Sequence, residues 1–129
     1  MASVTMLLVA LGGALGAVAR YLVDFWVESR GISRIPLGTV VVNITGSFGL
    51  GLLLGILDLT TAPGWLGTFL GAGFLAAYTT FSTWMFEAAR LVQRRAYAAA
   101  ALSLLGSIVA GVLAAAAGLA VASLIVGGT

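Results

Sequence analysis

Four long apolar stretches, joined by short polar connections, make up nearly the whole chain. They run from about residue 4 to 26, 37 to 57, 65 to 91 and 97 to 126. Each is long enough for a helix that crosses a bilayer, which needs about 20 apolar residues. No connection could hold a further domain. The pattern therefore predicts one all-α domain of four transmembrane helices, covering residues 1–129.

One polar segment interrupts the third stretch, the sequence YTTFSTW at residues 78–84, which has five hydroxyl groups in seven residues. Lipid offers hydroxyls no hydrogen-bond partner, so such a segment is costly inside a bilayer unless the protein uses it. The consecutive Thr79 and Thr80 can bond to the backbone in competition with the helix. We therefore expect the third helix to be broken near its middle, where freed backbone groups could bind ions.

Composition supports a membrane protein and removes several kinds of chemistry. The chain is 61% hydrophobic and 8% charged, whereas soluble domains carry roughly 25% charged residues. We expect a multi-pass protein of the inner (plasma) membrane, with lipid around it. The sequence has no Cys and no His, which excludes thiol chemistry and imidazole acid–base catalysis. No nucleophile–base pair is visible, so an enzyme is not expected, and a net charge of +2 does not indicate nucleic-acid binding.

All positive side chains lie in or beside the first and third connections. They are Arg20, Arg30, Arg34, Arg90, Arg94 and Arg95. With four spans these two connections share one side of the membrane, so the positive-inside rule predicts that both termini lie outside the cytoplasm.

Small residues four apart, such as Gly12 with Gly16 and Gly51 with Gly55, predict close helix packing. Four short helices enclose a pore poorly, so we expect an oligomer.

Several polar residues inside the stretches allow two interpretations each. Arg20 either snorkels to the headgroups or attracts anions to an entrance. Asn43, with Thr39 one turn before it, either lines a pore or hydrogen-bonds to a partner helix, or is only capped by a neighbouring helix. Glu87 either pairs with Arg90, which shares its helix face, or handles protons or cations.

The other candidates are hydroxyls and aromatic rings. Ser103 and Ser107 either bond back to their own helix or form a row of donors along a conduit. Phe81 and Trp84 share a helix face, and their ring edges carry partial positive charge that could meet an anion. Two aromatic residues at this spacing are also common in packed cores.

Three segments resemble the motifs of the Fluc (CrcB) family of fluoride channels: GGALGAVARY at residues 12–21, PLGTVVVNITGSF at 36–48 and TTFST at 79–83. The match runs from end to end, with the same number of spans and order of motifs. It implies an antiparallel dimer of four-helix subunits, with two fluoride pores and a structural sodium ion at its centre. Such a dimer exports fluoride passively from the cytoplasm.

The resemblance also implies roles for individual residues. The backbone carbonyls of Thr79 and Ala76 would bind the sodium ion, and Arg20 would lie at the pore entrance. Asn43 would be a fluoride ligand and Phe81 a ring whose edge meets the ion. The complete set expected along the fluoride pore is Asn43, Phe81, Trp84, Thr39, Ser82, Thr83, Glu87, Ser103 and Ser107.

The chain departs from the family pattern at three points. Ala76 stands where glycine is usual, and Trp84 where a second phenylalanine is usual. Subunits that insert in both orientations should have balanced loops, whereas this chain has every arginine on one side. We therefore expect a fixed orientation and an inverted homologous partner, with a dual-topology homodimer as the close alternative.

Two other functions share part of this sequence pattern. A small multidrug-type transporter also has four short helices, but it needs a carboxylate within its first helix, and Asp24 and Glu28 lie at or beyond the end of that stretch. A structural subunit of a membrane complex would explain the glycines and alanines, but not Asn43 together with the TTFST segment.

Overall fold

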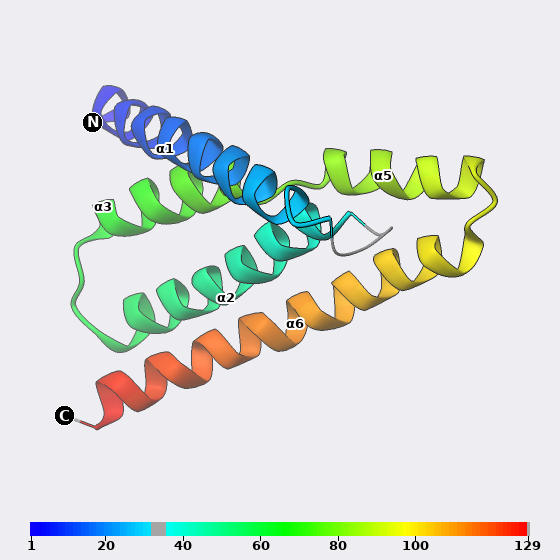
Figure 1. The fold of residues 1–129 in the computed structure, drawn as a ribbon. Coiled ribbons are helices and arrows are strands. Elements are labelled where there is room, and N and C mark those ends of the chain that lie inside the picture. The colour runs from blue at the N-terminus through cyan, green and yellow to red at the C-terminus, as the bar shows by residue number, and fades with distance from the viewer. Residues whose placement is uncertain (32–35, 129) are drawn as a thin grey trace.

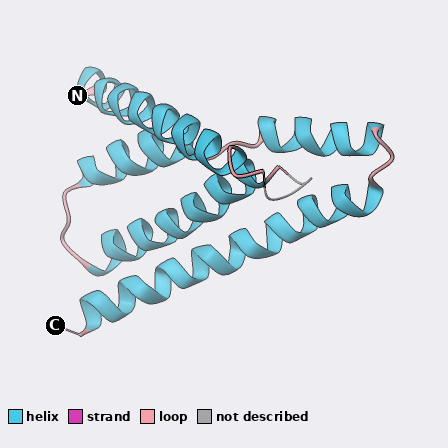
Figure 2. Ribbon diagram, viewed as in Figure 1, coloured by secondary structure: helices cyan, strands magenta, loops and turns pink. Residues whose placement is uncertain are grey.

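The computed structural model describes residues 1–31 and 36–128, so Arg34 lies outside the described residues. The first two predicted stretches form α1 (Ala2–Glu28) and α2 (Leu37–Leu59), and the last forms α6 (Tyr97–Gly127). The third stretch is divided into α3 (Gly64–Leu66), the π-helical η1 (Gly67–Leu75), α4 (Ala76–Tyr78) and α5 (Ser82–Gln93). The described residues form no strand (Figure 2), and the all-α prediction is confirmed.

The predicted break in the third helix is confirmed. Continuous helix ends at Tyr78, and Thr79 has extended backbone angles, with φ −83° and ψ 161°. A new helix begins at Ser82. Of the described helices, α1, α2 and α6 are each long and apolar enough to cross a bilayer. The third stretch instead consists of two shorter helical parts joined at the break.

Small residues set the packing of the helices on one another. α2 lies along α6, and α1 lies along η1. A side chain on Gly16 would collide with the carbonyl group of Phe74 in η1, and one on Gly51 with that of Ala115 in α6. The predicted close contacts are therefore formed between backbones, as expected where no hydrophobic effect drives association of helices in lipid.

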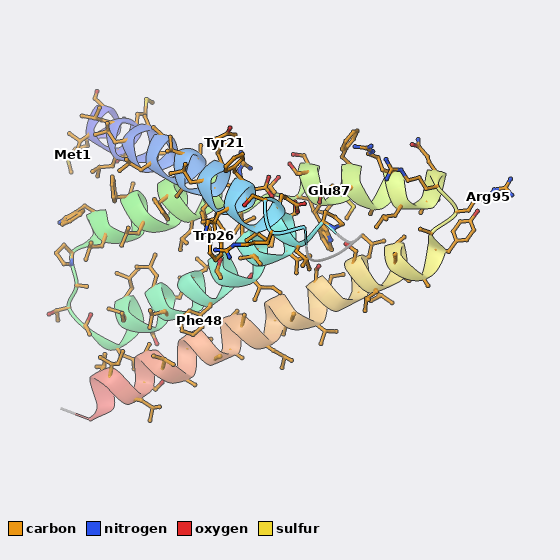
Figure 3. All side chains as sticks on the ribbon, in the orientation of Figure 1. Met1, Tyr21, Trp26, Phe48, Glu87 and Arg95 are labelled. Carbon is orange, nitrogen blue, oxygen red and sulfur yellow. The ribbon has the colours of Figure 1, made fainter. Side chains whose placement is uncertain are left out.

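The chain termini and the connections between helices lie at two opposite ends of the molecule. The N-terminus, the C-terminus and the connection from α2 to α3 lie at one end, and the connection from α5 to α6 lies at the other (Figure 1). Met1 and Arg95 accordingly mark opposite ends in Figure 3. This is the arrangement that an even number of spans requires.

Little of the side-chain surface is buried. The buried hydrophobic residues of the described chain are few and mostly small: Val42, Leu53, Ala88, Leu91, Ala100 and Ala122. Large apolar side chains point outward along α1 and α6, among them Leu15, Leu105 and Leu113. Such a surface suits lipid or a partner protein rather than water.

Candidate functional site

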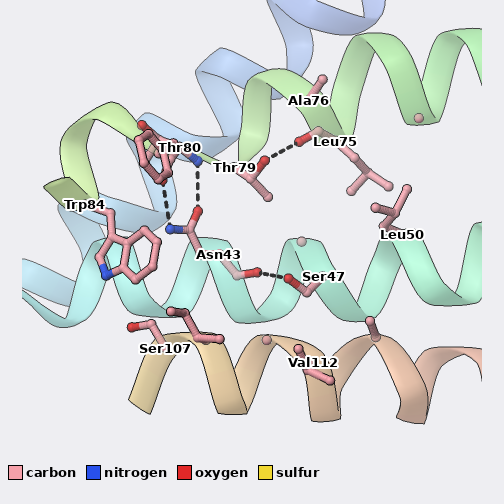
Figure 4. A pocket seen from close by; sticks show the side chains of 16 residues that line it. Asn43, Ser47, Leu50, Leu75, Ala76, Thr79, Thr80, Trp84, Ser107 and Val112 are labelled. Atoms are coloured by element: carbon pink, nitrogen blue, oxygen red, sulfur yellow. Dashed lines mark hydrogen bonds between the residues drawn. The ribbon is translucent and has the colours of Figure 1, made fainter. Parts of the chain in front are cut away.

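Asn43 of α2 holds the broken helix by both ends of its side-chain amide. Its Nδ2 donates to the carbonyl of Thr80 at 2.8 Å, and its Oδ1 accepts from the backbone N–H of Thr80, also at 2.8 Å (Figure 4). The amide replaces the helical partners that Thr80 lacks at the break. A buried backbone group without a partner costs about 1–3 kcal/mol of folding free energy. By pairing both backbone groups of Thr80, Asn43 removes this cost and so stabilises the break.

The hydroxyl groups around the break are also used locally. The Thr79 hydroxyl donates to the Leu75 carbonyl at 3.0 Å, and the Thr80 hydroxyl accepts from the backbone N–H of Thr83 at 3.2 Å. The Thr80 hydroxyl also lies 3.4 Å from the hydroxyl of Ser82. The Thr80 hydroxyl, which lies before the start of α5, thus satisfies a backbone N–H in the first turn of that helix, and the side chains of Ser82 and Thr83 stay exposed.

A groove of about 590 Å³ opens beside the break, between α2, the end of the third helix and α6. Of the residues predicted for the site, it brings together Asn43, Ala76, Thr79, Phe81, Trp84 and Ser107 (Figure 4). None of the described residues that line it carries a charge. Its polar groups are an amide, hydroxyls, aromatic edges and backbone.

The two aromatic residues of the groove contact each other edge to face, with ring centroids 5.9 Å apart and an interplanar angle of 79°. Phe81 remains 70% exposed. The indole Nε1–H of Trp84 donates to the backbone carbonyl of Ser103 in α6 at 3.3 Å. Trp84 therefore links α5 to α6 at the edge of the groove.

Glu87 pairs with α2 rather than with its neighbour on α5. Its Oε1 accepts a hydrogen bond of 3.0 Å from the hydroxyl of Thr39, which is 1% exposed. The Arg90 guanidinium instead lies over the Phe86 ring, 5.8 Å from its centroid. The sequence had left open an ion pair between Glu87 and Arg90, and the described side chains do not form it.

Three buried polar atoms have no hydrogen-bond partner among the described residues. They are Glu87 Oε2, Ser103 Oγ and Ser107 Oγ. The two serines therefore do not bond back to their own helix, although Ser47 does, donating to the Asn43 carbonyl at 2.7 Å. Buried hydroxyls are normally satisfied, so these groups are available to a ligand or to water.

Arg20 lies near the break from the α1 side. Its Nη1 donates to the Thr79 carbonyl at 3.5 Å, a long contact. With Asp24, Thr39 and Thr83 it lines a second, smaller cleft of about 180 Å³. Close by, Glu28 Oε1 accepts from the backbone N–H of Gly38 at 2.9 Å, which places a carboxylate at the N-terminus of α2, where negative charge is favoured.

Most of the residues predicted for the site line one of the two cavities. Ser82, Glu87 and Ser103 line neither cavity. Sequence reasoning did not include Thr80 in the site, although it bonds Asn43 twice. It also missed Glu28 as the partner of α2, because no sequence pattern shows that the end of α1 meets the start of α2.

Comparison with known proteins identifies relatives of the chain. The model of the family "CrcB-like protein, Camphor Resistance (CrcB)" matches residues 7–119. The "Fluoride-specific ion channel FluC 1" of Leifsonia xyli is 47% identical over 107 residues, covering 82% of this chain and 77% of the relative. The "Fluoride-specific ion channel FluC" of Acidobacterium capsulatum is 43% identical over 120 residues, covering 92% and 95%.

A third relative, the "Fluoride-specific ion channel FluC 2" of Cutibacterium acnes, is 44% identical over 126 residues, covering 92% of this chain and 98% of the relative. The match to the family model includes all of α2 and the break. Together with the long apolar helices, they show that the chain is a multi-pass protein of the bacterial plasma membrane and belongs to the CrcB-like family.

Proposed function

We propose that this protein is a passive fluoride channel. The observation that carries the proposal is the groove beside the broken helix, whose described lining offers polar donors and aromatic edges but no charged side chain. An ion loses hydration in a narrow site and needs groups at close range in exchange. Uncharged donors can stabilise an anion without trapping it, whereas a fixed cation in the same place would hold it.

The donors of the groove suit a small anion. An amide nitrogen carries two hydrogens, and Asn43 uses one of them on the Thr80 carbonyl, which leaves the other for an ion. Ser107 contributes an unpartnered hydroxyl on the opposite wall. The exposed ring of Phe81 can turn its positive edge toward the anion. The names of the relatives, which specify fluoride, agree with this donor set.

We infer that an inverted second subunit completes the pore. The groove is open on one side, and Phe81 at its rim is 70% exposed. A conduit for a hydrated anion needs walls all round in a bilayer. A second copy, or a homologous chain in the opposite orientation, would supply the missing wall and give an antiparallel dimer with two pores.

We propose that a structural sodium ion binds at the backbone of the break. α4 ends at Tyr78, so the carbonyls of Ala76 and Thr79 lack the usual helical N–H partners, and the Thr79 carbonyl has only the long contact of 3.5 Å from Arg20 Nη1. Carbonyl oxygens are ligands typical of hard cations. We propose that these two groups, with their counterparts in the inverted subunit, would hold the ion, whose charge would balance the carbonyl ends of the two helices and stabilise the dimer. Thermal stability of the dimer should therefore be higher in sodium than in N-methylglucamine.

The arginines of the sequence all lie in or beside the first and third connections, which supports a proposal about orientation. We propose a fixed insertion with both termini outside the cytoplasm and an inverted homologue as partner, with a dual-topology homodimer as the alternative. A cysteine placed at the C-terminus of this cysteine-free chain tests this in cells. Labelling from the outside only is expected, and equal labelling from both faces would rule out the fixed orientation.

The transport proposal is tested with a fluoride electrode. Purified protein in liposomes loaded with potassium fluoride should release fluoride when valinomycin provides a path for potassium, and should not release chloride under the same conditions. A small multidrug-type transporter or a structural subunit would give no fluoride release. If the chain works only with a homologue, release appears when both are reconstituted together.

A further inference from the structure

Three arginines cluster where α5 meets α6, at the end of the molecule opposite Met1. Arg90 lies in the last turn of α5 (Ser82–Gln93), Arg94 is the C-cap residue of that helix, and Arg95 follows it. All three side chains are exposed, and Figure 3 shows Arg95 projecting away from the helices. This arginine cluster, Arg90 with Arg94 and Arg95, concentrates positive charge on one turn of the chain.

The chain itself neutralises little of this charge. No acidic residue follows Glu87 in the sequence. The Glu87 carboxylate, which lies within electrostatic reach of Arg90, accepts its hydrogen bond from Thr39 of α2. No described carboxylate pairs with Arg94 or Arg95. An exposed positive cluster without counter-charges attracts anions from outside the protein.

The backbone at Arg95 has a conformation that favours glycine. Its φ is 59°, and among the described residues other than glycine it alone has a positive φ. The Arg95 N–H donates to the Val92 carbonyl at 2.9 Å and the Ala96 N–H to the Leu91 carbonyl at 2.8 Å, which is the Schellman motif at a helix C-terminus. Glycine is usual at its left-handed position, because a side chain there costs conformational energy. The turn therefore does not explain the arginine, whereas a use for its charge does.

Aromatic residues indicate that the cluster lies at the membrane surface. Phe86, one turn before Arg90, is 62% exposed, and the Arg90 guanidinium lies over its ring. Tyr97, at the start of α6, is 61% exposed. Phe86, Arg90 and Arg94 are each four residues apart, so they share a face of α5 that changes from apolar to basic toward its end. Such a face suits the acyl chain and the headgroup of a lipid.

We propose that the arginine cluster binds the phosphate of an anionic phospholipid, with Phe86 against the acyl chain. Guanidinium groups match phosphate oxygens with paired hydrogen bonds. Basic clusters beside a membrane helix attract anionic lipids. The site requires no fluoride, so it is tested independently of the proposed function.

The alternative is that these arginines act only as charges that fix the orientation of insertion. Lysine serves that purpose as well as arginine, because the positive-inside rule counts both. Paired hydrogen bonds to phosphate instead need the planar guanidinium. The two cases therefore differ in whether lipid is bound and in whether lysine can replace arginine.

Native mass spectrometry of the purified protein, released from a neutral detergent, counts bound lipid directly. Phosphatidylglycerol is titrated in, with phosphatidylcholine of the same acyl chains and inorganic phosphate as separate arms. We expect saturable binding of phosphatidylglycerol, together with a melting temperature that rises as it binds. Equal binding of phosphatidylcholine, or an equal rise in melting temperature with inorganic phosphate, would overturn the lipid site.

Variants locate the site on the protein. Arg94→Gln should need about tenfold more phosphatidylglycerol for half occupancy, since a lost hydrogen bond to a charged group costs at least that factor. Arg94→Lys, which keeps the charge, should also bind more weakly. The matched control Arg30→Gln removes an exposed arginine from the first connection and should bind as the unaltered protein does. Equal losses in Arg94→Gln and Arg30→Gln would show general charge attraction and overturn the site.

Arg95→Gly gives an independent check, because the site predicts opposite effects on stability with and without lipid. Without phosphatidylglycerol the variant should melt at a higher temperature than the unaltered protein, since glycine suits the left-handed backbone. With phosphatidylglycerol its melting temperature should rise by less. A rise as large as that of the unaltered protein would exclude Arg95 from the site.

Discussion

Replacing Asn43 by aspartate separates the two tasks that the structure gives this side chain. The change keeps the shape and one acceptor oxygen, so the bond from the Thr80 N–H remains. The donor to the Thr80 carbonyl, at 2.8 Å in the unaltered protein, is lost. Replacing an amide donor by an oxygen opposite a carbonyl should cost about 1–3 kcal/mol of folding free energy. Asn43→Ala loses both bonds and should cost about 2–6 kcal/mol.

Transport should suffer more than stability. An ionised aspartate in the groove repels fluoride by roughly 3 kcal/mol, taking an effective dielectric constant of about 20 and a separation of about 5 Å. This corresponds to a reduction in ion occupancy of about two orders of magnitude. Fluoride release by Asn43→Asp should therefore fall close to the rate of empty liposomes, while the protein still elutes as a single species in detergent.

The matched control is Gln93→Glu. It makes the same amide-to-carboxylate change at an exposed position at the end of α5, away from the groove. Release by this variant should be close to that of the unaltered protein. If Asn43→Asp released fluoride at the unaltered rate, the assignment of Asn43 to the conduction path would be wrong. If Asn43→Asp failed to fold, the bond from Asn43 Nδ2 to the Thr80 carbonyl would contribute more to folding than the about 1–3 kcal/mol expected here.

Three further changes test other parts of the site and fold. Phe81→Ile should lower fluoride release at least tenfold without lowering thermal stability, because the ring is 70% exposed; undiminished release would exclude the ring from the pore. In Gly51→Val the new side chain would collide with the Ala115 carbonyl of α6, so the variant should lose about 1–3 kcal/mol of unfolding free energy. Gly64→Ala is the control, because a side chain there meets open space. Thr39→Val should lower the free energy of unfolding by about 1–3 kcal/mol, because Glu87 Oε1 loses the hydrogen bond from the buried Thr39 hydroxyl. An unchanged melting temperature would show that water replaces the hydroxyl.

The predicted spans agree closely with the helices because the bilayer imposes a simple rule. Every backbone group in hydrocarbon must bond within its own segment, so a run of about 20 apolar residues can only be helix. The break was predictable for a related reason. Lipid offers no hydrogen-bond partner to the hydroxyls of residues 78–84, so a regular lipid-facing helix is unfavourable there. The helix does end before Thr79, whose backbone is extended.

The partners of individual side chains were not predictable in the same way. Glu87 was placed beside Arg90 by helix spacing, yet it bonds Thr39 from another helix. Spacing along one helix says which residues share a face, but not which neighbouring helix covers that face. The lack of back-bonding at Ser103 and Ser107 likewise depends on rotamers that local sequence leaves open.

The sequence by itself thus determined the membrane class, the helices, the break and the residue types available to an anion, because each follows from local hydropathy and backbone chemistry. Only the tertiary structure decided that Asn43 clamps both backbone groups of Thr80 and that Trp84 reaches the Ser103 carbonyl. These contacts join residues from different helices, and their geometry depends on how closely small residues such as Gly16 and Gly51 let the helices approach.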